Sequence, residues 1–323
     1  TGDVDITGTL TGNASAISLG SLTINSGGTY SATSGTTTIT SFINNKSIVN
    51  NSGTFTHNSG TVVIDVTNSN KTMVDARSTY HNLTINSDGS NKEVELNNQA
   101  ATIEGNLTVQ EGKLFTYATS GRHLTVTGDV SIEDGGEIEM NDVAGKNATF
   151  GSLEIQSGGT YNATSGTTTI TNRNSNAKYW ENGGGTFTHN NGTVKFTDND
   201  HSGIVENTFY NMHIASANAN HYAVSWEDVS GNALKVLNNL IIESGDFELA
   251  TAGDTLDVYG KTIIDNSLAG GTPNNAYARF NNDKNQTGTI THHGIVEIIS
   301  GTYHVEDGAT VNMAGIRNVG GLV

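Results

Sequence analysis

The sequence contains no cysteine and a single proline among its 323 residues. Without cysteine the chain can form no disulfide, no thiolate metal site and no thiol nucleophile. Basic residues are also few: 15 lysines and arginines stand against 32 aspartates and glutamates, which gives a net charge of −17. Binding to nucleic acid depends on cations that neutralise phosphates, so we expect no nucleic-acid partner. No apolar run approaches the roughly 18 residues of a membrane helix, so we expect no membrane span in this chain.

The chain also lacks the pattern of a helical protein, because helix-forming residues never follow a 3.6-residue period over a useful length. Short alternating runs rich in threonine, valine, isoleucine and aromatic residues predict strands instead. Breakers made of glycine, asparagine, serine and aspartate separate these runs and predict tight corners. A Leu-x-Ile/Val element recurs through the chain, often at short intervals: it begins at Leu22, Leu83, Leu107, Leu124, Leu153, Leu240 and Leu256, and at Met212 in place of leucine.

A much longer repeat is superimposed on this short one. The run GSLTINSGGTYSATSGTTTIT at residues 20–40 returns as GSLEIQSGGTYNATSGTTTIT at residues 151–171, an offset of 131 with only three differences. The segment Thr1–Ile6 matches Thr127–Ile132 in the same way, so we expect the chain to begin inside a repeat unit. On this basis we divide residues 1–323, expected to be one continuous solenoid, into a partial unit 1–19, units 20–150 and 151–280, and divergent C-terminal coils 281–323.

The differences between the two copies predict which side chains face inward. Glu154 replaces Thr23, and this exchange lies between the unchanged apolar residues of a Leu-x-Ile element. Since adjacent strand residues point to opposite faces, leucine and isoleucine should face a core and the exchanged residues should face water. A short repeat of about 20–30 residues without a helical half predicts a parallel β-solenoid. Rows of asparagine and threonine should then form hydrogen bonds between stacked coils. Asn-Gly pairs would also suit the hairpins of an antiparallel sandwich, which is the alternative fold.

Two groups of polar residues are candidates for metal sites. The acidic run at residues 133–139 could hold calcium, but it lacks the known calcium-loop patterns, so we interpret it as a solvated corner. His57, His189 and His292 each follow a Thr-x-Thr or Ile-Thr run, and they are separated by whole repeat units. We therefore expect turn residues here, since a metal site needs three or four converging ligands.

The large aromatic residues Tyr179, Trp180, Tyr222 and Trp226 are the strongest candidates for contact with a ligand or partner. They lie in stretches that depart from the clean strand pattern and are predicted to form side loops, and exposed aromatic rings stack on sugars and anchor interfaces. Local packing within the loops is the alternative. No phosphate loop, nucleophile elbow or metalloprotease motif is present, so we expect no catalytic, cofactor-binding or metal-binding residue and no enzyme activity.

The runs at Gly185–Thr197 (GTFTHNNGTVKFT) and Asn82–Ser87 (NLTINS), in a cysteine-free chain rich in glycine, asparagine and threonine, resemble the β-strand-repeat proteins of bacterial surfaces. Filamentous-haemagglutinin-like adhesins and some phage tail fibres are their broader relatives. The resemblance covers most of the chain but depends on composition and short motifs. It implies a right-handed parallel β-solenoid (β-helix) that is exported and does structural or adhesive work, and it implies no catalytic residue.

The sequence thus predicts an extracellular, cell-surface rod: a stalk or a filament subunit that associates end to end with other copies through its terminal coils. Surface glycans are a further candidate partner. The alternative function is a phage tail fibre, or a β-helix that binds or depolymerises glycans. A depolymerase would need converging carboxylates, or a carboxylate with a lysine or arginine, and the few basic residues form no visible cluster.

Overall fold

The computed structural model describes residues 2–67, 70–87, 92–116, 122–140, 146–197, 202–206, 208–215, 224–226, 233–249, 255–265, 276–280, 289–305 and 310–320. Within these ranges no helix occurs, and hence none that is long and apolar enough to cross a membrane. The named strands pair in parallel and stack turn upon turn, so the predicted parallel β-solenoid is confirmed and the antiparallel sandwich is wrong.

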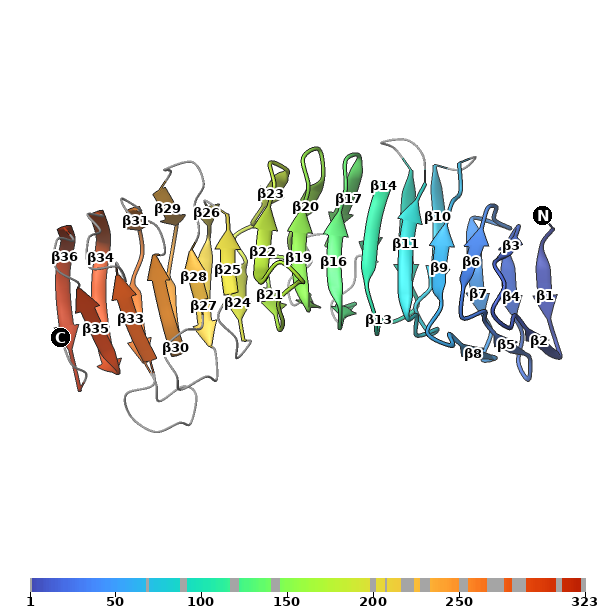
Figure 1. The fold of residues 1–323 in the computed structure, drawn as a ribbon, viewed down its shortest axis with the longest axis horizontal. Coiled ribbons are helices and arrows are strands. Elements are labelled where there is room, and N and C mark those ends of the chain that lie inside the picture. The colour runs from blue at the N-terminus through green and yellow to red at the C-terminus, as the bar shows by residue number, and fades with distance from the viewer. Residues whose placement is uncertain are drawn as a thin grey trace. The chain divides into compact units, whose positions relative to one another are not determined.

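The chain divides into two compact units, the first formed by residues 1–166 and 182–190 and the second by residues 167–181 and 191–323. In the first unit the turns supply strands to three faces, and paired strands of one face lie side by side (Figure 1). On the second face the turn that contains Tyr80 supplies only an isolated bridge to Ile103. The first face contains β1 (Val4–Ile6), β4 (Leu22–Ile24), β7 (Lys46–Asn50), β10 (Lys71–Asp75), β12 (Glu93–Asn97), the second half of β14 (Leu107–Thr116), β17 (Gly136–Glu139), β20 (Thr160–Asn162) and β23 (Thr186–Thr188). The second face contains β2 (Thr9–Thr11), β5 (Thr29–Ser31), β8 (Thr54–Thr56), β13 (Ala101–Ile103), β15 (Leu124–Val126) and β18 (Asn147–Phe150). The third face contains β3 (Ile17–Leu19), β6 (Thr36–Ile39), β9 (Thr61–Ile64), β11 (Asn82–Asn86), the first half of β14, β16 (Asp129–Ile132) and β19 (Ser152–Ile155).

The second unit is built in the same way from three series of parallel strands. One series contains β22 (Lys178–Asn182), β25 (Ser202–Val205), β28 (Val224–Trp226), the second half of β30 (Leu240–Leu249), β33 (Ala276–Phe280) and β35 (Thr302–Val305). Another contains β21 (Thr167–Ile170), β24 (Thr193–Phe196), β27 (Asn211–Ala215), the first half of β30, β32 (Thr262–Asp265) and the second halves of β34 (Thr289–Ser300) and β36 (Thr310–Asn318). The third contains β26 (Thr208–Phe209), β29 (Ala233–Val236), β31 (Thr255–Val258) and the first halves of β34 and β36.

The core of the first unit consists of side chains stacked from turn to turn. Leu22 and Ile24 are buried, whereas Thr23 between them is half-buried, as the comparison of the two repeat copies predicts. On the second face, Tyr30 contacts Phe55 with 5.8 Å between ring centroids. The rings of successive turns thus form a column inside the coil.

Such columns are possible because apolar residues of one turn pair with apolar residues of the next, although the turns differ in length. On the first face Leu22 pairs with Ile48, and further along Leu114 pairs with Ile138. Both intervals agree with the predicted coil length of roughly 20–30 residues. The first turn is shorter, since Val4 already pairs with Leu22.

Polar side chains link successive turns at the corner where each third-face strand begins. The Asn82 Oδ1 atom accepts a hydrogen bond of 2.9 Å from the Asn106 backbone N–H, and Asn106 Oδ1 accepts one of 2.9 Å from the Asp129 N–H. Asp129 Oδ1 then accepts a bond of 2.7 Å from the Ser152 hydroxyl. The predicted asparagine rows are therefore present, although in this row the amide oxygens pair with the backbone and not with other amides.

The long sequence repeat does not contain a whole number of turns. Starting at β4, the chain makes five turns to reach β17 on the same face, and then passes β18 before it reaches β19, the counterpart of β4. The copy of a first-face strand thus lies on the third face. In the same way β5 and β8 belong to the second face, while their copies β20 and β23 belong to the first. Within the first unit, the copies β19, β20 and β23 therefore lie on other faces than β4, β5 and β8.

Candidate functional site

Two of the four aromatic residues predicted to contact ligands lie in the core. Tyr179 and Trp180 are consecutive residues of β22, and both are fully buried. The expectation that these two rings lie exposed on a side loop is wrong. A β-bulge between Lys178 and Trp180 interrupts the strand alternation, which allows two neighbouring side chains to point inward. The first copy has the same irregularity within β7, where Ser47 and Ile48 are both buried.

The buried rings of the second unit form an aromatic cluster. The Tyr179 ring lies 6.1 Å from that of Phe196, and the Trp180 ring lies 5.7 Å from that of Phe209 in an edge-on arrangement. Phe196 and Phe209 contact each other at 6.2 Å. These rings stabilise the interior by apolar burial and edge-to-face contact. Tyr222 lies outside the described residues, and of Trp226 only the backbone, at the end of β28, is described.

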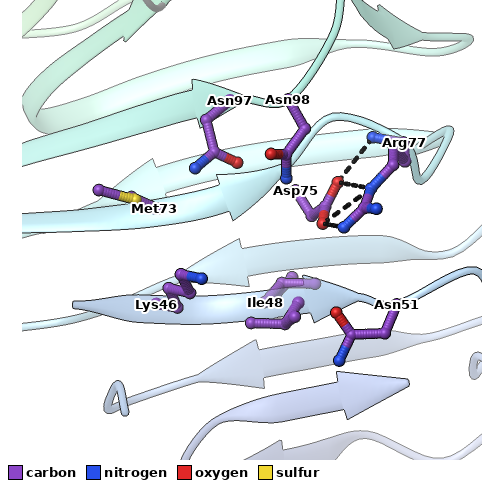
Figure 2. A pocket seen from close by; sticks show the side chains of 9 residues that line it. Lys46, Ile48, Asn51, Met73, Asp75, Arg77, Asn97 and Asn98 are labelled. Atoms are coloured by element: carbon purple, nitrogen blue, oxygen red, sulfur yellow. Dashed lines mark hydrogen bonds and ion pairs between the residues drawn. The ribbon is translucent and has the colours of Figure 1, made fainter. Parts of the chain in front are cut away.

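A polar cavity of about 70 Å³ opens beside the first face of the first unit, and Figure 2 shows Asp75 and Arg77 joined at its edge. Arg77 Nε donates to Asp75 Oδ1 at 3.0 Å, and the Asn50 backbone N–H donates to Asp75 Oδ2 at 3.0 Å. Burial by itself would raise the pKa of Asp75, but the hydrogen bonds from Arg77 and Asn50 outweigh it and hold this pKa below its usual value. The residues that line the cavity are Lys46, Ile48, Val49, Asn51, Met73, Asp75, Arg77, Asn97 and Asn98.

The size and charge of this cavity indicate a structural role. Water occupies about 30 Å³ in the liquid, so the cavity holds only a few water molecules, whereas ligand pockets usually exceed about 300 Å³. Its buried carboxylate is already neutralised by the guanidinium of Arg77. The cavity therefore lies beside the corner that follows β10, and its buried carboxylate already has a cationic partner.

The acidic run at residues 133–139 is used for contacts between turns. The ammonium group of Lys113 lies 2.7 Å from Glu139 Oε2 and 3.2 Å from Glu137 Oε1. Asn162, one turn further along, donates to Glu137 Oε1 at 2.7 Å. Two of the carboxylates thus have cationic or amide partners on neighbouring turns.

The histidines of the Thr-His runs differ from one another. His57 lies in the corner after β8, as predicted, and its carbonyl accepts a hydrogen bond of 2.9 Å from the Gly60 N–H. The turn assignment is wrong for His292, which is buried within β34. Its Nδ1 lies 2.8 Å from the Thr262 hydroxyl, and its Nε2 lies 2.9 Å from the Tyr303 hydroxyl. Burial lowers the pKa of His292 to about 4, with a contribution from the adjacent histidine, so the imidazole is neutral in the core at physiological pH.

The one cluster of potential metal-ligating side chains found in the described residues is His57, His81 and Glu104. They occupy the corner between the second and third faces on three successive turns. His57 Nε2 lies 3.0 Å from Glu104 Oε2, and the imidazoles of His57 and His81 are nearly parallel with 5.4 Å between centroids. One potential ligand atom from each residue lies within 4.8 Å of the other two. Two imidazoles and a carboxylate therefore converge at an accessible position.

Sequence reasoning did not find this cluster because it compared His57 with residues one long repeat away. The interval from His57 to His81 is one turn of the coil, and the interval from His81 to Glu104 is shorter by a single position. This period of one turn was the signal that could have identified the cluster. Comparison of the chain with protein-family models, with curated proteins and with solved structures finds no match.

Proposed function

We propose that the chain is the shaft of an extracellular structural or adhesive rod without catalytic activity. The observation that carries this proposal is the continuous parallel pairing along the first face of the first unit, from β1 to β23. Each turn forms backbone hydrogen bonds with its neighbours and buries its apolar side chains against them, so such a stack can be extended by repetition. This construction suits a protein that spans distance, and the net charge of −17 favours solubility.

The location outside the cell is tested on intact cells or particles that produce the protein. They are treated with a protease that does not cross membranes and are then probed with antibodies against this chain. We expect antibody binding before treatment, and we expect the intact polypeptide to be lost after it. Complete protection of the chain in intact cells, with digestion only after lysis, would contradict the proposal. An unrelated intracellular protein that stays protected is the control for cell integrity.

We propose a second copy of this chain as the partner of the C-terminal coil. Among the described strands, β36 pairs only with β34, and most of its residues are exposed. Its apolar side chains include Ile316, which is 45% exposed, and Met313, which is 37% exposed. An open parallel strand edge with apolar neighbours is a template for the addition of a further strand. The N-terminal strand β1 of another copy, which pairs only with β4 among the described strands, is the edge that would continue the stack.

Replacement of Ile316 by lysine tests this association. Analytical ultracentrifugation of the wild-type chain over a range of concentrations should show species larger than the monomer, and Ile316→Lys should shift the distribution toward monomer. A charge placed on an edge strand disfavours pairing between edges. Ile43→Lys is a matched control, because Ile43 is also 45% exposed but lies between β6 and β7, neither of which is a terminal strand of the stack. A wild-type chain that stays monomeric at all concentrations would contradict the proposed end-to-end association.

A further inference from the structure

The corner formed by His57, His81 and Glu104 has a backbone that is fixed at each of the three positions. The His57 carbonyl accepts the Gly60 N–H at 2.9 Å, and the His81 carbonyl accepts the Gly105 N–H at 2.7 Å. The N–H of Glu104 donates to a backbone carbonyl of the preceding turn at 2.8 Å. Only side-chain torsions are therefore left to adjust when the three groups bind something in common.

We infer that His57, His81 and Glu104 form a binding site for a divalent transition-metal ion of the zinc type. Two histidines and one carboxylate are a donor set that zinc accepts, and three protein ligands leave further positions open for water or for a side chain of a partner. Calcium and magnesium do not fit, because these ions prefer sites made of oxygen ligands. The Glu104 side chain is 53% exposed and the His57 side chain is 25% exposed, so an ion can reach the ligands directly from solvent.

The distances in the cluster are close to those that an ion requires. Ligand atoms about 2.0–2.1 Å from a tetrahedral zinc ion lie about 3.3 Å from one another. The Nε2 atom of His57 and the Oε2 atom of Glu104 are already 3.0 Å apart, and all three potential ligand atoms lie within 4.8 Å of each other. Closure of the site therefore needs movements of about 1 Å by partly exposed side chains, with no change in the coil.

The protonation of His57 is compatible with binding at a small cost. The Ser59 backbone N–H donates to His57 Nδ1 at 3.0 Å, so in the neutral ring Nε2 carries the proton and directs it toward Glu104. When a metal ion takes Nε2, the proton of the neutral ring resides on Nδ1, so the ring no longer accepts from the Ser59 N–H, which bonds to water instead. Ser59 is exposed, so water can replace this hydrogen bond.

The second repeat copy indicates that the solenoid corner does not need these residues. His189 is the counterpart of His57, but the positions that correspond to His81 and Glu104 are Tyr210 and Leu237. The sequence of this region thus recurs in the second copy without the donor set. Three ligating residues at one-turn spacing in the first copy are therefore not explained by the requirements of the fold.

The experiment uses the untagged full chain, since a histidine tag would bind the same ions. Isothermal titration with zinc chloride should give one saturable site per chain, and zinc should raise the melting temperature. His81→Asn and Glu104→Gln should each weaken zinc binding at least about tenfold, since loss of even an indirect metal contact has effects of this size. Both variants change partly exposed side chains, and circular dichroism checks that they remain folded.

His189→Asn is the matched control, because it removes the equivalent histidine of the other copy and should leave the titration unchanged. The inference fails if the wild-type chain shows no saturable zinc binding. It also fails if His81→Asn and Glu104→Gln bind zinc as the wild type does, or if His189→Asn alone abolishes binding. None of these results would alter the proposed function, which depends on the stacking of the coils.

Discussion

Replacement of Gly60 by alanine is expected to lower the free energy of unfolding by about 3 kcal/mol, because the new methyl group has no room between two turns. A Cβ atom at this position would lie 2.0 Å from the carbonyl oxygen of Thr33 and 2.8 Å from that of Gly35. Both are backbone atoms of the preceding turn. The Thr61 N–H donates to the Gly35 carbonyl at 2.9 Å, so the turns cannot separate without loss of the hydrogen bonds that join them.

Gly8→Ala is the matched control for this substitution. A Cβ atom at Gly8 has no heavy atom within 4 Å, so we expect a change within about 0.5 kcal/mol. Both variants are compared with the wild type by the midpoint of chemical denaturation and by the melting temperature. If Gly60→Ala unfolds at the same denaturant concentration as Gly8→Ala, the close approach of the two backbones at this corner is not a constraint on the sequence.

Replacement of Lys146 by methionine is expected to destabilise the fold by about 2 kcal/mol, because it leaves buried acceptors without a donor. The Lys146 side chain is fully buried, and its ammonium group donates to the Thr116 carbonyl at 2.9 Å and to the Thr116 hydroxyl at 2.8 Å. A third bond of 2.9 Å reaches the Met140 carbonyl. Methionine fills a similar volume but donates no hydrogen bond. Lys46→Met, which changes an exposed lysine, should have little effect on the unfolding midpoint and is the control.

The same lysine should give the wild-type chain a characteristic pH dependence. Burial lowers the pKa of Lys146 to about 8, and the charge of Glu139 offsets this only in part. An unfolded lysine has a pKa of about 10.4, so between these values the unfolded chain binds a proton that the folded chain has released. Stability from this group therefore rises as the pH increases from about 8 to about 10.4. Unfolding midpoints measured across this range should show the rise in the wild type and in Lys46→Met. If the unfolding midpoint of Lys146→Met rose with pH to the same extent, Lys146 would not be the group that causes the rise.

The fold class could be predicted from the sequence because the strand signal is local and repeated. The alternation in Leu22–Ile24 depends only on side-chain chemistry, and the corner residues depend only on backbone preferences. The burial of Tyr179 and Trp180 could not be predicted, because a β-bulge breaks the two-residue alternation and no local residue pattern announces it. The departure from the clean strand pattern was therefore wrongly interpreted as an exposed side loop at Tyr179 and Trp180.

Contacts between turns were predictable only to the extent that the turn length was known. The His57, His81 and Glu104 cluster follows a period of one turn, but the turns on the first face differ in length, so the register had to come from the structure. Lys146 gives no signal at all, since its three acceptors belong to residues 6 and 30 positions away that have no common motif. The partners of the polar groups in the interior depend on which residues of successive turns lie next to each other. A single sequence does not show this register.

The offset of the repeated strands by one face bears on how such a chain can grow. A duplication of one long repeat places the copy of a first-face strand on the third face. The copy packs there with the same buried side chains, Leu153 and Ile155. The three sides of the first unit are therefore interchangeable to this extent, and the smallest modular element is one strand with its corner. Gain or loss of a single such element would move every later motif to another face of the solenoid. A short insertion could therefore change which way a surface motif points and leave the packing of the interior unchanged.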